Sequence, residues 1–295
     1  MKILLSNLWM KNFGGSELVT LELAEEYQAR GWDVLLYSPQ FGEPLKSHIK
    51  VPTTMAFPDL SEFDIVWNHH DLFTDRWKPR MSQAIVSNHM SSYVAQEFPK
   101  NPEWENKNCQ FIFANSPETR TKMIQLGLMN VDVFPNPAPE RFMPSKSGVM
   151  VNQNTNEPFH PEKKYALFVS NHRPTELDIV SRGLDIPIRS VGELNDFLRL
   201  TPELLRDAAF VVCNGKTVQY ALRAGTPVFL YDQFGGPGWL TNENFAHAAA
   251  FNFSGRGFET KVSLSTLSTW REAKPIPFVP LRYKLEYCLS FYGLL

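Results

Sequence analysis

The sequence predicts an α/β protein of two consecutive, doubly wound domains that face a cleft. Short apolar strands alternate with helical segments along most of the chain. A stretch rich in Pro, Asn, Ser and Lys interrupts this alternation, which then restarts. The 295 residues are enough for two domains of ordinary size. We therefore predict a first domain over residues 1–142, a linker over 143–164, a second domain over 165–280 and a C-terminal helix over 281–295.

The chain opens with a strand–helix–strand unit. Residues 2–6 form a short apolar run, which is typical of a strand buried on both faces. Gly14 and Gly15 precede a helical stretch that ends near Gly31, and residues 33–38 form the next strand. Because such crossovers are right-handed, this unit predicts a parallel, Rossmann-like sheet.

The same alternation continues through both halves. Further strands are predicted in the first half at 63–67, 83–87, 110–114 and 131–134, with a helix at 118–126. In the second half, strands are predicted at 165–170, 188–191, 208–213 and 227–231, with helices at 175–181 and 217–224. Ligands of such sheets gather at the carboxyl ends of the strands, so the chemistry is expected in the loops there.

Composition excludes some classes of function. A hydrophobic fraction of 43% with 20% charged residues is typical of a globular protein, and a net charge of −2 argues against nucleic acid as a partner. No apolar run approaches the roughly 20 residues of a transmembrane helix. Three widely spaced cysteines predict a reduced, cytoplasmic protein. The basic and aromatic residues 76–80 favour a solvated loop, with peripheral contact at the inner membrane face as the alternative.

Asn214-Gly215-Lys216-Thr217 is the most informative short stretch. It lies between an apolar strand and a helix, where free backbone N–H groups and the Lys216 ammonium favour an anion. An ordinary strand–helix turn is the alternative. Gly-Lys-Thr also ends a P-loop motif, but that motif requires glycine where this chain has Phe210.

Two further loops carry residues suited to a nucleotide. Gly14 and Gly15 form a glycine turn before a helix, without the spacing of a nicotinamide site. Arg173 follows a strand of the second half, where its guanidinium could grip a diphosphate or form a surface salt bridge. Gly192 and Glu193, after another strand, are assigned to the nucleoside from their loop position.

Histidines follow several predicted strands. His69, His70, His89 and His172 all occupy such positions, where a lone histidine is more often a polar structural residue than a catalyst. His89 is the strongest candidate because it follows its strand directly. The adjacent His69 and His70, next to Asp71, do not suit one metal ion, and we expect neither a metal nor another cofactor.

A glycine-rich stretch follows the strand at 227–231. Asp232, Gly235 and Gly236 predict a loop that lies against sugar hydroxyls, with a tight turn as an equal alternative.

Several of these stretches resemble the GT-B glycosyltransferases, especially the group 1 or family 4 enzymes. The opening strand with Gly14-Gly15-Ser16-Glu17 is similar to the first glycine loop of that family. Residues 85–89 resemble the strand that ends in a histidine beside the transferred sugar. Residues 113–116 and 133–136 resemble the end of the N-terminal half, and residues 220–228 resemble a helix and strand of the second half. The resemblance covers nearly the whole chain.

The chain also departs from that family. Retaining members carry two glutamates, and Val212 and Tyr220 occupy the matching places here, so retention is not carried over. Lys216-Thr217 is similar to GT-B members that hold the diphosphate at a glycine-rich helix start. No Asp-x-Asp motif occurs, which argues against the metal-dependent GT-A class.

The resemblance implies a metal-independent enzyme that moves a hexose-type sugar from a nucleoside diphosphate donor to a glycan or lipid-linked acceptor. A sugar-nucleotide epimerase and a non-catalytic nucleotide- or sugar-binding protein are the alternatives. The hypothesis assigns catalysis to His89, the donor diphosphate to Gly14, Gly15, Arg173, Gly215, Lys216 and Thr217, the nucleoside to Gly192 and Glu193, and the sugar to Asp232, Gly235 and Gly236.

Overall fold

The chain folds into two compact α/β units, which are described separately. Unit 1 comprises residues 1–136 together with 292–295, and unit 2 comprises residues 137–291. The computed structural model describes residues 1–70, 78–80, 82–144, 164–171, 174–192, 197–258, 264–277 and 279–295. Most of the predicted linker, 145–163, lies outside the described residues.

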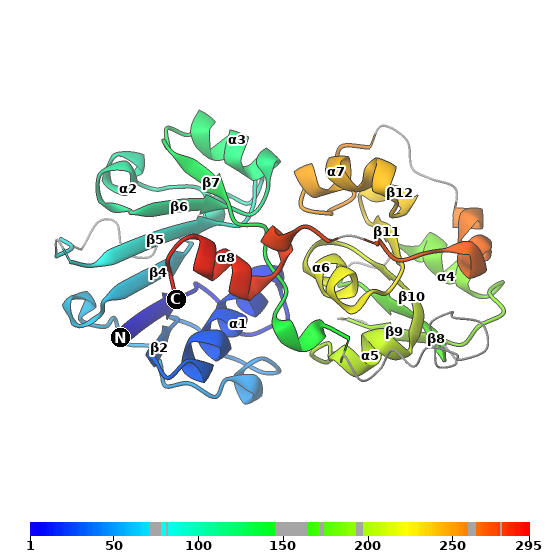
Figure 1. Cartoon of the computed structure of the whole chain (residues 1–295), viewed down its shortest axis with the longest axis horizontal. Coiled ribbons are helices and arrows are strands. Elements are labelled where there is room, and N and C mark those ends of the chain that lie inside the picture. Colours follow the sequence, from blue (N-terminus) through cyan, green and yellow to red (C-terminus); the bar gives the residue numbers. More distant parts are fainter. Residues whose placement is uncertain are drawn as a thin grey trace. The chain divides into compact units, whose positions relative to one another are not determined.

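Unit 1 is built on a seven-stranded sheet with the order β3-β2-β1-β4-β5-β6-β7, in which every neighbouring pair is parallel (Figure 1). The strands are β1 (Lys2–Ser6), β2 (Asp33–Tyr37), β3 (Thr53–Thr54), β4 (Ile65–His69), β5 (Ala84–His89), β6 (Phe111–Ala114) and β7 (Val131–Val133). The α-helices are α1 (Gly15–Ala29), α2 (Pro102–Asn108) and α3 (Pro117–Gln125), and short 3-10 turns are η1 (Lys46–His48), η2 (Leu60–Glu62) and η3 (Ala95–Glu97).

The inner strands of unit 1 are buried because their side chains are apolar on both faces. Ile3, Leu4 and Leu5 of β1 have no exposed surface. Farther along the sheet, the ring of Trp67 packs against Phe113 and Phe134 at centroid distances of 5.9 and 5.4 Å. These contacts fix the strand ends from which the polar residues of unit 1 project.

Unit 2 has a five-stranded sheet with the order β12-β11-β10-β8-β9. Its strands are β8 (Tyr165–Val169), β9 (Ile188–Val191), β10 (Ala208–Cys213), β11 (Val228–Asp232) and β12 (Gly235–Trp239). All pairs are parallel except β11 with β12, which form an antiparallel hairpin. Gly235 and Gly236 therefore belong to an edge strand, and the prediction of a loop at these two residues is wrong.

The helices of unit 2 are α4 (Thr175–Ser181), α5 (Pro202–Asp207), α6 (Gly215–Ala224), α7 (Asn242–Ala250) and α8 (Leu285–Phe291), with 3-10 segments η4 (Glu140–Phe142), η6 (Leu264–Glu272) and η7 (Leu281–Tyr283). Helix α6 begins two residues earlier than the sequence predicts. Gly215, at its start, has a φ of +54°, a conformation that L-residues with side chains rarely adopt, and this permits the short turn from β10.

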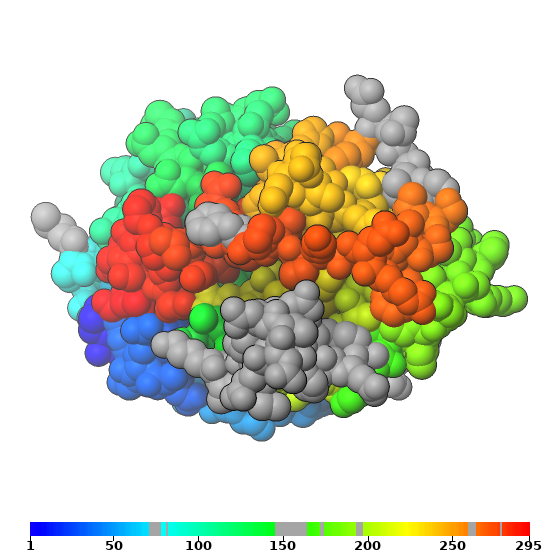
Figure 2. All heavy atoms as spheres, turned by 45° about the vertical axis from the view of Figure 1, so that its right-hand side comes forward, coloured from blue at the N-terminus to red at the C-terminus, as the bar shows by residue number. Residues whose placement is uncertain are grey.

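The core of unit 2 lies on its sheet. Phe210, Phe229 and Leu267 are fully buried there, and the indoles of Trp239 and Trp270 pack against the same cluster. Figure 2 shows the segment 264–277 (orange) at the molecular surface beside α7 (yellow-orange). Within the described ranges, none of the helices combines the length and the hydropathy that crossing a bilayer requires.

Candidate functional site

The polar residues of unit 1 gather where the strand order of its sheet reverses. The chain leaves β1 toward β2 and β3, whereas β4 lies on the other side of β1 and continues toward β7. In doubly wound sheets the carboxyl ends of two such strands border the ligand crevice. Here they are followed by Asn7 and His70, and His70 has a left-handed φ of +66°. This edge is therefore the candidate site of unit 1.

His69 is a neutral structural residue of this edge. Its Nδ1 donates to the Ser6 carbonyl at 3.1 Å, and its Nε2 lies 3.1 Å from the Asn88 amide nitrogen, which donates to it. Burial first, and then the charge of the neighbouring His70, lower the pKa of His69 to about 3. With both nitrogens engaged and no exposed surface, His69 holds β1, β4 and β5 together at their ends.

His70 contacts a buried carboxyl group. Its Nε2 lies 2.9 Å from Oε1 of Glu97, and its Nδ1 accepts a 3.4 Å hydrogen bond from the Leu8 N–H. The other carboxylate oxygen of Glu97 accepts the Met90 N–H at 3.1 Å. The pair therefore connects the loops that follow β1, β4 and β5.

His89 lies beside Glu97 but is enclosed. Its Nε2 donates to Oε2 of Glu105 at 2.9 Å, and its Nδ1 donates to the Glu97 carbonyl at 2.7 Å. Burial alone would lower the pKa of His89, but the hydrogen bond and the charge of Glu105 raise it overall. Because His89 is 2% exposed and both nitrogens face acceptors, this geometry favours a positioning role over the role of a base.

Glu17 is the half-exposed carboxylate of this edge, and sequence reasoning did not assign it a role. It lies in the first turn of α1, and burial raises its pKa to about 7. Hydrogen bonds from two backbone N–H groups, those of Asn12 and of Glu17 itself, and the charge of His70 partly offset this rise, whereas Glu97 adds to it. A carboxylate has about four acceptor positions, so about two remain for a ligand.

Gly14 and Gly15 differ in what surrounds them. A Cβ on Gly14 would overlap the Glu17 carboxyl group, whereas a Cβ on Gly15 would meet open space. Gly14 thus allows the Glu17 side chain to fold back over the start of α1. The sequence signal for Glu17 was its place three residues after Gly14 in the glycine turn that precedes a helix.

Unit 2 has an equivalent edge at the carboxyl ends of β8, β10 and β11. Asp232, at the end of β11, accepts hydrogen bonds from Ser170 Oγ at 2.8 Å and from Asn214 Nδ2 at 2.5 Å. Asp232 is 4% exposed, so its carboxylate is enclosed by these neighbours. It joins three strand ends at the position where the sheet order reverses, between β8 and β10.

Glycines let backbones approach one another closely around this edge. A Cβ on Gly192 would overlap the carbonyl of Ser170, and a Cβ on Gly236 would overlap the carbonyl of Leu230. Gly255 approaches the carbonyl of Gly235 in the same way. Each of these glycines therefore has a packing role that is independent of any ligand.

The start of α6 also lies at this edge. Gly215 and Thr217 are half-buried, and Asn214 does not cap the helix with its side chain. Lys216, by contrast, is buried: its Nζ donates to the Pro137 carbonyl at 2.7 Å and lies 4.9 Å from the ring centroid of Tyr220. The N–H groups at this helix start suit an anion, whereas the Lys216 ammonium is held within unit 2.

A strained segment supports the same helix start. Asn252 and Phe253 both have a φ of +52°, and the Phe253 carbonyl accepts the Gly215 N–H at 2.8 Å. Such left-handed conformations cost of order 1–3 kcal/mol per residue and concentrate near functional sites. Arg173, Glu193, His172 and Asp71 lie outside the described residues.

Comparison with known proteins identifies the architecture. No protein-family model matches the sequence, and no curated protein matches it significantly. The structure of Anabaena Alr3699/HepE in complex with UDP-glucose matches with a TM-score of 0.53 and 13% identity, covering 100% of this chain and 98% of that chain. AviGT4, a glycosyltransferase involved in avilamycin A biosynthesis, matches with a TM-score of 0.47 and 17% identity, covering 77% and 78%.

The match to Alr3699/HepE extends over both units. It agrees with the two mainly parallel sheets described above, one of seven strands and one of five. The chain therefore has the GT-B fold, in which two Rossmann-like α/β domains follow one another.

Proposed function

We propose that this chain is a metal-independent glycosyltransferase that uses a UDP-sugar, with a hexose as the transferred group. The observation that carries the proposal is the edge of unit 2 at which Asp232 joins Ser170 and Asn214 beside the half-buried start of α6. Ligands of doubly wound sheets bind at such edges. The fold likeness to a protein in complex with UDP-glucose supports the choice of donor.

On the donor side, backbone N–H groups at the start of α6 would bind the diphosphate. Thr217 is half-buried there, and the helix dipole adds positive potential. The Gly215 N–H is itself bonded to the Phe253 carbonyl, so Gly215 would contribute by letting the diphosphate approach the backbone closely. These fixed dipoles would stabilise the negative charge that grows on the leaving phosphate, which is the task that a metal performs in other transferases. The nucleoside role of Gly192 and the sugar role of Asp232, Gly235 and Gly236 belong to the same hypothesis.

On the acceptor side, we assign the proton transfer to Glu17. Its carboxylate is half-exposed at the reversal edge of unit 1, and its pKa of about 7 suits a base that works near neutral pH. His89 would act indirectly, by holding Glu97 and Glu105 in place. A base that activates the acceptor hydroxyl for direct displacement of the phosphate implies inversion of configuration at the sugar.

The acceptor is proposed to be a glycan or a lipid-linked sugar, as in polysaccharide biosynthesis. Cys213 and Cys288 are buried free thiols, which supports the proposed cytoplasmic location. Peripheral contact with the inner membrane face through residues 76–80 remains part of this hypothesis, and residues 76 and 77 lie outside the described residues.

A thermal-shift screen against UDP, GDP, ADP, CMP and TDP, each with and without Mg²⁺, tests the donor. We expect UDP to stabilise the protein without Mg²⁺, because a ligand that binds only the native state adds about 2.7 kcal/mol at a hundredfold excess over Kd. Stabilisation by another diphosphate instead of UDP would identify a different nucleoside in the donor. Stabilisation only with Mg²⁺ would contradict the metal-independent mechanism, and no stabilisation by any of the five would favour a degenerate binding protein.

A further inference from the structure

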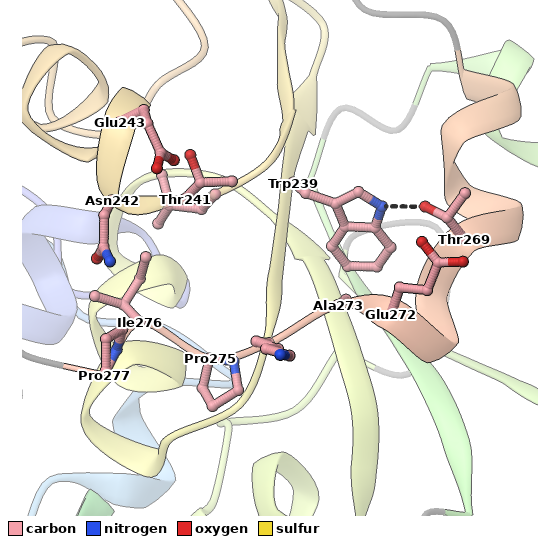
Figure 3. Close-up of a pocket in the computed structure, with 12 residues that line it drawn as sticks. Trp239, Thr241, Asn242, Glu243, Thr269, Glu272, Ala273, Pro275, Ile276 and Pro277 are labelled. Carbon is pink, nitrogen blue, oxygen red and sulfur yellow. Dashed lines mark hydrogen bonds between the residues drawn. The ribbon is translucent and has the colours of Figure 1, made fainter.

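A pocket lies on the surface of unit 2, outside the residues assigned to the donor. It has a volume of about 480 Å³ and is lined by residues 239–243, Thr269 and residues 272–277. Figure 3 shows Trp239 and Glu272 on one side and Thr241 and Glu243 on the other, with the segment around Pro275 between them. A volume of this size is within the range of small-molecule sites, which is roughly 300–1,000 Å³.

This pocket is separated from the donor edge by the length of the hairpin. In the antiparallel pair, Asp232 lies opposite Gly235, whereas Phe229, near the amino end of β11, lies opposite Trp239. The pocket residues after Trp239 therefore continue past the amino end of β11. Asp232 with its partners and the pocket therefore lie at opposite ends of the β11–β12 pair.

Trp239 presents its indole to the pocket in a fixed orientation. Its Nε1 donates to the Thr266 carbonyl at 3.0 Å and to Thr269 Oγ1 at 3.1 Å. Inside the unit, the indole makes near-perpendicular contacts with Phe210 and Phe229, at centroid distances of 5.2 and 5.1 Å. The ring is half-buried and held from two sides, so little side-chain entropy would be lost when a ligand packs against it.

The polar groups around the indole are mainly hydrogen-bond acceptors. Glu243 and Glu272 are exposed at the rim, and the lower pKa of Glu243, caused first by its hydrogen bond with Thr241, keeps this carboxylate ionised at neutral pH. Among the described lining residues, Lys274 is the single basic residue beside Glu243 and Glu272, so the described lining carries a net negative charge. Such a lining disfavours phosphates and other anions.

We propose that this pocket binds a neutral saccharide, as a second sugar site separate from the donor edge. The apolar face of a pyranose ring would pack on the indole of Trp239, and its hydroxyl groups would donate to Glu243 and Glu272. Proline and isoleucine side chains at 275–277 supply further apolar surface. This ligand class follows from the lining itself and does not depend on the proposed transfer reaction.

Calorimetric titration of the full chain with maltotriose, cellotriose and chitotriose tests the proposal. At least one of these neutral trisaccharides is expected to bind, and saturating UDP is expected not to compete. Glu243→Gln and Glu272→Gln are each expected to weaken this binding about tenfold, because each removes a charged hydrogen-bond acceptor. Both side chains are exposed, so both variants should fold normally, which circular dichroism would check.

Glu103→Gln is the matched control, because Glu103 is an exposed carboxylate of unit 1 and its replacement changes the net charge equally. It is expected to leave the saccharide affinity unchanged. The proposal is overturned if none of the trisaccharides binds, if UDP displaces them, or if neither glutamine variant weakens binding. A UDP titration of the same sample reports on the donor edge separately, so failure here is distinct from failure of the proposed transferase.

Discussion

Replacing Glu105 by alanine is expected to lower the free energy of unfolding by about 3–5 kcal/mol, the usual cost of removing one partner from a buried ion pair. Glu105 and His89 are 1% and 2% exposed, and a single hydrogen bond of 2.9 Å joins them. Without the carboxylate, the His89 imidazolium would be left in the core with no direct counter-charge. Urea unfolding monitored by circular dichroism measures the difference.

The loss should also depend on pH. The pKa of His89 is higher in the folded state than in the unfolded state, so its contribution to stability is fully present below the unfolded pKa of about 6.5 and is lost as pH rises through the folded pKa. The gap between wild type and Glu105→Ala should therefore be largest in mild acid. Glu103→Ala, an exposed position on the same helix, is the control and should cost little. Equal losses for the two variants would contradict the buried pair.

Replacing Glu17 by glutamine is expected to reduce turnover by about 10²- to 10⁴-fold, the usual contribution of a general base. Glutamine keeps the size of the side chain but cannot take up a proton. In the wild type, kcat/KM should rise with pH through about 7, since Glu17 must lose its proton before it can accept another. The variant should lack this limb of the pH profile.

Glu26→Gln is the control for this variant. Glu26 lies on the same helix, where it pairs with Arg30 at the surface, and such pairs contribute little to stability. Normal turnover for Glu17→Gln, or a pH profile unchanged near 7, would exclude Glu17 as the base and favour His89 in that role. Loss of folding in Glu17→Gln would be detected by comparing the melting temperatures of the two variants.

The alternation of strands and helices was predictable from the sequence because both sheets are mainly parallel. Their inner strands are apolar on both faces, as in β1 and β10, so each appears as a short hydrophobic run. The edge strand β12 was missed because its sequence, Gly-Gly-Pro-Gly-Trp, contradicts strand propensity. Gly236 is required where its backbone approaches the Leu230 carbonyl closely, and that contact depends on the partner strand β11.

The candidate site was predictable only in part. The glycine turns and the helix start at Gly215 carry local signals, and the sequence pointed to them. The role of a histidine instead depends on partners that are distant in the sequence: His89 is enclosed by Glu105, sixteen residues away. Lys216 is likewise held by the carbonyl of Pro137, 79 residues away. Burial of Glu17, which raises its pKa, is a property of the folded edge and has no local sequence signal.

Titration of UDP-glucose into the wild type and into Thr217→Glu, both in EDTA, tests the central claim most directly. A carboxylate in the first turn of a helix is compatible with the helix dipole, so the variant should fold, but it would repel a diphosphate at the start of α6. We expect saturable binding to the wild type, at least a tenfold loss in Thr217→Glu, and no loss in Thr121→Glu, which adds the same charge at an exposed position of α3. Equal affinity for wild type and Thr217→Glu, or no binding to the wild type, would contradict a donor site at this edge.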